Sequence, residues 1–135
     1  MTPHRGEWQR LFGVLPEGPA AIIDRLKETA VDFGVTVLLK GNPTIVAGRD
    51  GKAYILPSGN SALAKAGSGD VLSGIIVSLL AQGASPMNAA VLGAAVHGEA
   101  GTASSRKLSE YSVIASDVVK AIPKVISGLL KDQYT

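Results

Sequence analysis

A segment in the middle of the chain, Gly67-Ser68-Gly69-Asp70, combines residue types that can bind an anion and move a proton. The two glycines and the serine stand directly before an apolar helix expected over residues 70–82. Unpaired backbone N–H groups and the positive end of the helix dipole favour a phosphate at such a helix start, and glycine lets the backbone approach it closely. The carboxylate of Asp70 could then accept a proton from a hydroxyl group beside the anion. The alternative is that Asp70 only caps the helix and satisfies its N–H groups.

A second polar segment follows an apolar run at residues 35–39. Its sequence is Lys40-Gly41-Asn42-Pro43-Thr44. The run before it is almost free of polar residues, which is typical of a strand buried on both faces in a parallel sheet. Ligands of α/β proteins bind at the carboxyl ends of such strands. Lys40 could therefore contact phosphate oxygens as a point charge, or it could be a solvated lysine followed by a Gly-Asn-Pro turn.

The third segment lies at the N-terminus and has the sequence Thr2-Pro3-His4-Arg5-Gly6-Glu7. A histidine beside a proline is usually a loop residue. Glu7 suits the first turn of a short helix expected over residues 6–11, where a carboxylate interacts favourably with the helix dipole. The other histidine, His97, lies on an apolar helical face and is expected to be a core residue with a satisfied hydrogen bond. Neither histidine has the spacing of a metal site, so a structural metal is not expected.

Helical and extended patterns alternate around the three segments and indicate an α/β fold. Helices are expected over residues 6–11, 20–33, 70–82, from Pro86 onward and over 117–131, and strands over 35–39, 44–47 and 53–56. The helix at 20–33 is amphipathic, and Gly34 is a candidate for its C-terminal cap. Ser116 is expected to cap the final helix, which Pro123 should kink or split.

Composition excludes several function classes. The chain has 135 residues, which suits one domain, and its 46% hydrophobic and 18% charged residues argue against disorder. The absence of cysteine excludes a disulfide scaffold, a thiolate zinc site and a cysteine nucleophile. The net charge is +2, the basic residues are scattered and aromatic residues make up 4%, so no nucleic-acid partner is expected. No apolar run has the length of a membrane span and no signal peptide is visible, so a cytoplasmic location is expected.

In this order, the three segments resemble the motifs of the ADP-dependent NAD(P)H-hydrate dehydratases, a family of the ribokinase-like superfamily. The resemblance rests on Thr-Pro-His-x-Gly-Glu, on a strand ending in Lys-Gly-x-x-Thr, and above all on Gly-Asn-x-x-Leu-Ala-Lys-x-Gly-Ser-Gly-Asp-Val-Leu-x-Gly from Gly59 to Gly74. It implies the C-terminal part of a ribokinase-like fold, with a central, mostly parallel sheet and flanking helices. Residues 1–135 would be the C-terminal half of such a domain, without the first half of the family's fold.

The resemblance also implies a repair reaction. ADP, or ATP in eukaryotic relatives, phosphorylates the ring hydroxyl of hydrated NADH or NADPH, and elimination of phosphate restores the dinucleotide and leaves AMP. Asp70 would contact the hydrated ring and act as the base on its hydroxyl. The other matched positions are an anion hole at Gly67, Ser68 and Gly69, nucleotide contacts at Lys40, Gly41, Asn42, Pro43, Thr44 and Gly69, and a substrate contact at His4. ADP would be the co-substrate, and Mg²⁺ is expected to accompany it.

Two residues depart from the family pattern. Ala66 stands where the family usually has glycine, and a positive φ there would cost about 1 kcal/mol or more. Arg5 stands where proline is common, which would loosen the turn that holds His4.

Two other functions stay open at this point. One is a ribokinase-like kinase of a small molecule, such as a vitamin-precursor alcohol, which would share the Gly-x-Gly-Asp loop. The other is a non-catalytic fragment that binds nucleotide or assembles with another chain. The expected partners are hydrated NAD(P)H and ADP, together with a homo-oligomer or the missing N-terminal half.

Overall fold

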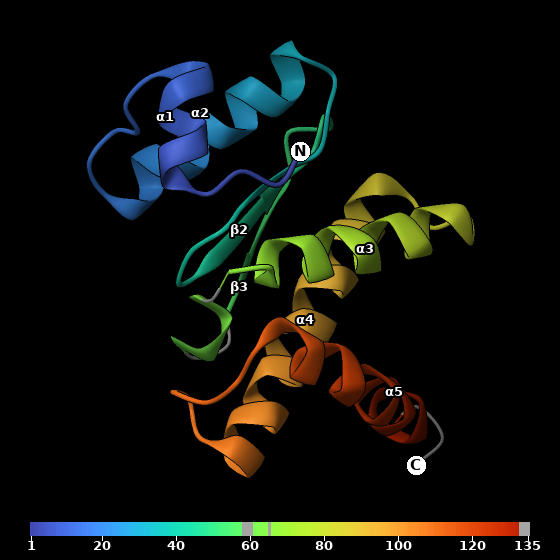
Figure 1. Cartoon of the computed structure of the whole chain (residues 1–135). Helices are drawn as coiled ribbons and strands as arrows, with labels where there is room; N and C mark the ends of the chain where they lie inside the picture. The colour runs from blue at the N-terminus through green and yellow to red at the C-terminus, as the bar shows by residue number, and fades with distance from the viewer. Residues whose placement is uncertain (58–60, 65, 133–135) are drawn as a thin grey trace.

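A computed structural model describes residues 1–57, 61–64 and 66–132 of the chain (Figure 1). Along the chain the elements are α1 (Arg5–Phe12), α2 (Pro19–Asp32), β1 (Val37–Leu39), β2 (Thr44–Ala47), β3 (Ala53–Leu56), the 3₁₀ turn η1 (Ser61–Ala64), α3 (Ser68–Ala81), α4 (Pro86–Leu108) and α5 (Ala115–Asp132). Helices and strands are combined in one fold, so the predicted α/β class is confirmed.

The strands form an antiparallel sheet in the order β1-β2-β3. The N-terminal residues run along the outer edge of β1 in the parallel direction, where His4 and Lys40 form a bridge. Two hydrogen bonds of 2.8 Å join them to β1, from the Leu38 N–H to the Met1 carbonyl and from the Lys40 N–H to the Pro3 carbonyl. Short turns that reverse the chain connect β1 to β2 and β2 to β3, so these strands pair antiparallel. Among the described residues, the expected parallel pairing is therefore limited to the outer edge of β1.

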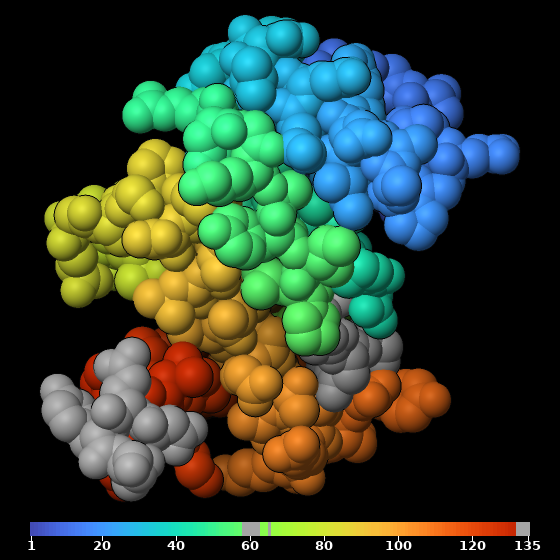
Figure 2. Space-filling view, turned by 180° about the vertical axis from the view of Figure 1, so that it is seen from behind, coloured from blue at the N-terminus to red at the C-terminus, as the bar shows by residue number. Residues whose placement is uncertain are grey.

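Helices cover both faces of the sheet (Figure 1). On one face, α1 and α2 pack against alternate residues of β1 and β2 in a cluster of Trp8, Ile22, Leu26, Ala30, Val37, Leu39, Ile45 and Ala47. On the opposite face, α3 and α4 pack against the intervening strand residues in a cluster of Leu38, Val46, Leu72, Ile76, Ala89 and Ala90. Seen from behind, the β2–β3 hairpin lies between α2 and α4, which both contact it (Figure 2). β1 is therefore buried on both faces, as its apolar sequence predicts.

The connection between α2 and β1 is longer than the sequence pattern indicates, because α2 ends at Asp32 rather than Phe33 and β1 begins at Val37 rather than Val35. β1 begins at Val37 because the N–H groups of Gly34 and Val35 still donate to the carbonyls of Val31 and Ala30 in α2. Gly34 has a φ of +64°, the left-handed conformation that ends many helices. The C-cap itself is Phe33, and Gly34 follows it as the left-handed residue that ends the helix, which is the glycine role that the sequence predicts.

The start of the final helix corrects another expectation. α5 begins at Ala115, and the Asp117 carboxylate accepts a hydrogen bond from the Ile114 N–H at 3.2 Å. The predicted cap at Ser116 is wrong, because the helix starts one residue before it. α5 also runs through Pro123 as one helix, so the chain is not split there.

Candidate functional site

The N-terminus of α1 is closed by reciprocal hydrogen bonds between His4 and Glu7. The Glu7 N–H donates to His4 Nδ1 at 3.1 Å, and the His4 N–H donates to Glu7 Oε2 at 2.8 Å, which makes a capping box. Because Nδ1 accepts, the neutral imidazole carries its proton on Nε2. A Cβ on Gly6 would lie 3.1 Å from His4 Cε1, so glycine gives the ring its space over the first turn. Arg5 is exposed at the start of α1, and the capping box holds His4 without a proline there.

Lys40 connects this capping box to the start of α3. Its ammonium lies 3.4 Å from Glu7 Oε2, and its side chain is 28% exposed. A Cβ on Gly69 would lie 3.3 Å from Lys40 Nζ, so the ammonium rests against the first turn of α3. The parallel pairing of residues 1–4 with β1 brings these groups together. The three sequence segments therefore meet around the Lys40 ammonium, which is not a freely solvated group.

α3 begins at Ser68, two residues earlier than its periodicity predicts. Gly67 is the N-cap in the left-handed conformation, with a φ of +83°, and no side chain in the described part of the chain caps the helix. The first helical hydrogen bond runs from the Val71 N–H to the Gly67 carbonyl at 3.2 Å. The preceding N–H groups of Ser68, Gly69 and Asp70 therefore have no partner within the helix. Asp70 is exposed in the first turn and is not the N-cap, so the alternative that it merely caps the helix is wrong.

The Ser68 side chain points into the protein. Its hydroxyl lies 3.0 Å from Nε2 of His97, and the two residues are 3% and 8% exposed. His97 is thus a buried, hydrogen-bonded histidine, as its apolar helical face predicts. Any anion bound at this turn would meet the Ser68 backbone N–H, because the hydroxyl is held by α4.

The segment after β1 forms a tight turn into β2. Thr44 is buried at the start of β2, and its hydroxyl donates to the Gly41 carbonyl at 3.1 Å. Gly41, Asn42 and Pro43 are exposed. Lys40 reaches the start of α3, whereas the Thr44 hydroxyl is turned inward against its own turn.

Two pKa values in this region are shifted. The hydrogen bond from the His4 backbone, supported by the positive charge of Lys40, lowers the pKa of Glu7 below its ordinary value of 4.5, although desolvation acts in the opposite direction. Burial lowers the pKa of His97 below its ordinary value of 6.5, and a hydrogen bond with the Ser68 backbone partly opposes this shift. At neutral pH the Glu7–Lys40 pair is therefore ionic, and His97 is neutral.

The rest of the longest motif adds two facts. Gly59, Asn60 and Lys65 lie outside the described residues. Ala66 is described and is exposed directly before the N-cap Gly67. The strain that a positive φ would cause at Ala66 stays a prediction.

The described residues contain neither a cluster of metal ligands nor a helix that could cross a membrane. No group of three or more His, Cys, Asp or Glu residues there could hold a metal ion. No helix in the same residues is both long enough and apolar enough to cross a membrane.

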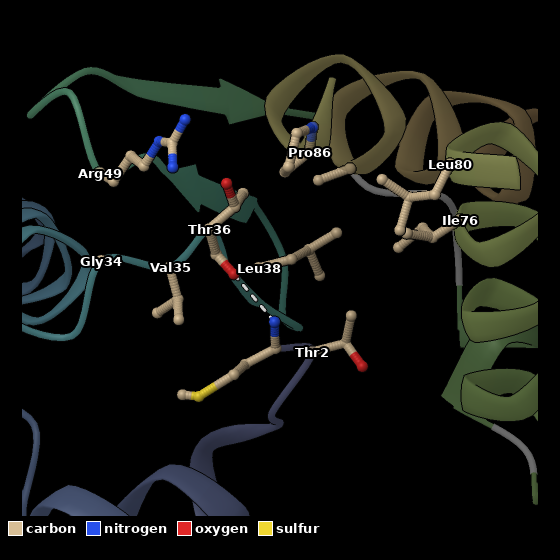
Figure 3. A pocket seen from close by; sticks show the side chains of 11 residues that line it. Thr2, Gly34, Val35, Thr36, Leu38, Arg49, Ile76, Leu80 and Pro86 are labelled. Atoms are coloured by element: carbon tan, nitrogen blue, oxygen red, sulfur yellow. Dashed lines mark hydrogen bonds between the residues drawn. The ribbon is translucent and has the colours of Figure 1, made fainter. Parts of the chain in front are cut away.

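A hollow of about 330 Å³ lies at the outer edge of the sheet, between the N-terminal residues and the helices α3 and α4 (Figure 3). Leu38, Ile76 and Leu80 form part of its apolar lining. The Met1 ammonium donates to the Thr36 carbonyl at 2.8 Å on its other side. Ile76 lies about 12 Å along α3 from the start of the helix, so the hollow is distinct from the turn that carries Asp70.

Two residues join the site although the motif resemblance assigned them no role. Glu7 is one, and the signal for it in the sequence is the His-x-x-Glu spacing of a capping box. His97 is the other. The sequence signal for it is weaker and consists of two glycines, Gly93 and Gly101, which lie four residues to either side of it on the same face of α4.

Several known proteins are similar to this chain over nearly its whole length. The bifunctional NAD(P)H-hydrate repair enzyme Nnr of Moorella thermoacetica is 42% identical over 140 residues, which cover 100% of this chain and 26% of that protein. The ADP/ATP-dependent NAD(P)H-hydrate dehydratase from Bacillus subtilis, co-crystallized with ATP/Mg²⁺, is 33% identical with a TM-score of 0.85, covering 93% of this chain and 46% of that one. A ribokinase-like superfamily protein from Enterococcus faecalis is 30% identical with a TM-score of 0.75, covering 94% and 43%.

The chain therefore has a ribokinase-like fold and spans between about a quarter and a half of the length of these relatives. The family model described as NAD(P)H-hydrate dehydratase matches residues 1–124. That match includes the capping box at His4, the Lys40 turn and the start of α3. The convergent segments and the matched residues together show that the chain belongs to the NAD(P)H-hydrate dehydratase family.

Proposed function

We propose that residues 1–135 are the C-terminal half of an ADP-dependent NAD(P)H-hydrate dehydratase domain and supply its phosphoryl-transfer side. The reaction converts hydrated NADH or NADPH and ADP into NADH or NADPH, AMP and phosphate. The observation that carries the proposal is the position of Lys40 Nζ against Gly69, where a cation, a helix N-terminus and the carboxylate of Asp70 occur together. The similarity to an ADP/ATP-dependent dehydratase supports the same chemistry.

The start of α3 would bind the phosphoryl group that is transferred. The N–H groups of Ser68 and Gly69, with Gly67 as the flexible N-cap, donate to its oxygens and stabilise the charge that develops there. Lys40, whose ammonium forms an ion pair with Glu7, adds a positive charge beside these N–H groups. The contacts of Lys40 with Glu7 and Gly69 hold these groups together, so little rearrangement is needed to form the anion hole.

Asp70 would act as the base in the first step. It accepts the proton of the ring hydroxyl while the hydroxyl oxygen attacks the terminal phosphorus of ADP, and the bond from that phosphorus to the AMP oxygen breaks. Elimination of the new phosphate, with loss of a proton from the neighbouring ring carbon, restores the dihydropyridine. The exposure of Asp70 fits this role, since a base must reach the substrate.

Mg²⁺ would accompany ADP. This ion binds through one or two carboxylates, phosphate oxygens and water, so it does not need a cage of protein ligands. The start of α3 and Lys40 fit this mode, because they would bind the phosphates that carry the ion. The ion would neutralise phosphate charge during transfer.

The remaining matched residues would bind the two ligands. His4 has Nε2–H at an exposed helix start and would donate to the hydrated dinucleotide. The exposed turn of Gly41, Asn42 and Pro43, between Lys40 and Thr44, would contact the nucleotide.

A protein partner would complete the substrate side. We propose association with the N-terminal half of the domain, or a homo-oligomer, in the cytoplasm. The hollow beside the N-terminal residues supports this, because it presents Leu38 and Ile76 next to residues 1–4, beyond which another strand could extend the sheet. Sedimentation of the chain alone and mixed with that half tests the association.

The activity test follows the absorbance of the reduced nicotinamide after the chain is mixed with hydrated NADH, ADP and Mg²⁺, with and without the N-terminal half. Restored NADH with stoichiometric AMP and phosphate supports the proposal. A phosphorylated product that accumulates on a hydroxymethyl substrate, without NADH, indicates a kinase. ADP binding by calorimetry without turnover, even with the added half, indicates a non-catalytic fragment.

A further inference from the structure

α4 places one polar residue between two close glycine contacts, all on the same face. A Cβ on Gly93 would lie 2.7 Å from Ile76 Cγ1 in α3, and a Cβ on Gly101 would lie 2.6 Å from Leu63 Cδ2 in η1. These contacts hold α4 unusually close to both elements. His97 lies midway between the two glycines in sequence and reaches the Ser68 hydroxyl at 3.0 Å.

This contact occurs where α3 needs an anchor. No side chain of the described residues caps α3, and its N-cap is Gly67, a glycine in the left-handed conformation, the residue type with the most backbone freedom. Ser68 is the first residue of the helix and is bonded to α4 by its side chain, while its backbone N–H belongs to the proposed anion hole. Ser68 therefore contacts the buried interior through its side chain and would contact the phosphate through its backbone N–H.

We propose that His97 is a positioning residue for the anion-binding turn: by holding the Ser68 hydroxyl, it fixes the direction of the N–H groups that receive the transferred phosphoryl. The inference rests on the proposed function for its consequence in catalysis. The geometric part, that His97 fixes the first turn of α3, does not.

The arrangement differs from a histidine that only fills the core. Both partners are buried and polar, and the bond gives the Ser68 hydroxyl a partner in a ring nitrogen of His97. The bond joins residues of two helices at a turn that no side chain of the described residues caps. Loss of the bond should therefore be felt first at that turn rather than evenly over the fold.

The experiment measures amide exchange of Val71, whose N–H forms the first helical hydrogen bond of α3, in the whole chain. His97→Leu and Ser68→Ala should each speed that exchange about five- to tenfold relative to the rest of the sheet and helices, as expected for a lost buried hydrogen bond. His97→Gln places an amide nitrogen near the position of Nε2 and should restore exchange close to that of the original chain.

Ser104→Ala is the matched control. It removes another buried serine of α4, whose hydroxyl donates to the Asp117 carbonyl at 3.2 Å in α5 rather than to α3. It should leave Val71 exchange unchanged. The proposal is overturned if, in all four variants, the Val71 exchange rate changes only as much as the global stability of the fold predicts. It is also overturned if His97→Gln does not restore slow exchange of Val71. Ser68→Ala keeps the test decisive if His97→Leu fails to fold.

Calorimetry with ADP and Mg²⁺ on the same variants separates the two claims. About tenfold weaker binding in Ser68→Ala and His97→Leu, with rescue by His97→Gln, supports both. If the original chain binds no ADP, the proposed function fails while the Val71 result still decides the positioning role. If it binds ADP and these variants bind it as tightly, the positioning role fails alone.

Discussion

Replacing Gly69 with alanine should stabilise the fold and weaken nucleotide binding at the same time. Gly69 is a residue of the first turn of α3 without a positive φ, so alanine suits its backbone. The new Cβ would lie 3.3 Å from Lys40 Nζ, which is the end of a flexible side chain and can move aside at little cost. The ammonium would then leave the position where it meets the proposed phosphate.

The two effects have different sizes. Glycine to alanine in a helix is worth about 0.5–1 kcal/mol, which corresponds to roughly 2–4 °C in Tm for a chain of this size. Loss of a charged hydrogen bond to phosphate costs about 1.5–3 kcal/mol, or roughly ten- to a hundredfold in the Kd for ADP. Thermal melts by circular dichroism and calorimetry with ADP and Mg²⁺ measure the two quantities separately.

Two neighbouring glycines of the same motif provide the controls. Gly74 has open space around its Cβ position within α3, so Gly74→Ala should give a similar rise in Tm and unchanged ADP binding. Gly67 has a φ of +83°, so Gly67→Ala should lower stability by about 1 kcal/mol or more. The reasoning is refuted if Gly69→Ala lowers Tm as Gly67→Ala does, or binds ADP as tightly as Gly74→Ala.

Other predictions concern the carboxylates and the buried histidine. Asp70→Asn should leave the melt and the Kd for ADP nearly unchanged and lower turnover of hydrated NADH by about 10²–10⁴-fold, as for loss of a general base; an unchanged rate would remove Asp70 from the chemistry. The pKa of Glu7 is lowered on folding, so its stabilising contribution is complete above 4.5 and is lost as the pH falls through the folded-state pKa. The single tryptophan, Trp8 in α1, should report that acid loss by fluorescence, and Glu7→Gln should abolish the pH dependence. The pKa of His97 is also lowered on folding, so the free energy of unfolding should fall as the pH drops below 6.5, and His97→Gln should flatten that part of the curve in urea titrations.

Local patterns were sufficient to predict most elements. The apolar period of residues 20–33 predicts α2, and the glycine after it ends the helix as expected. The apolar run before Lys40 predicts a strand buried on both faces, and β1 is buried throughout. These predictions succeed because helix periodicity and strand burial are determined by residues that are close to one another along the chain.

Helix starts were predicted less well than helix bodies. α3 begins at Ser68 rather than Asp70, and α5 begins at Ala115 rather than after Ser116. Ser, Asp and Gly can each stand at several positions near a helix start, so residue type does not identify the cap. Backbone conformation at Gly67 and the hydrogen bond of Asp117 determine it instead.

The sequence by itself identifies the three polar segments, the residue types that suit phosphate chemistry and, through the motif from Gly59 to Gly74, the family. Tertiary structure alone places Lys40 between Glu7 and Gly69, and it turns the Ser68 hydroxyl inward to His97. These contacts join residues on different helices and strands, and their distances depend on how the sheet and α4 pack. The composition of the site is therefore local information, whereas the direction of each charge and hydrogen bond in it is a property of the packed fold.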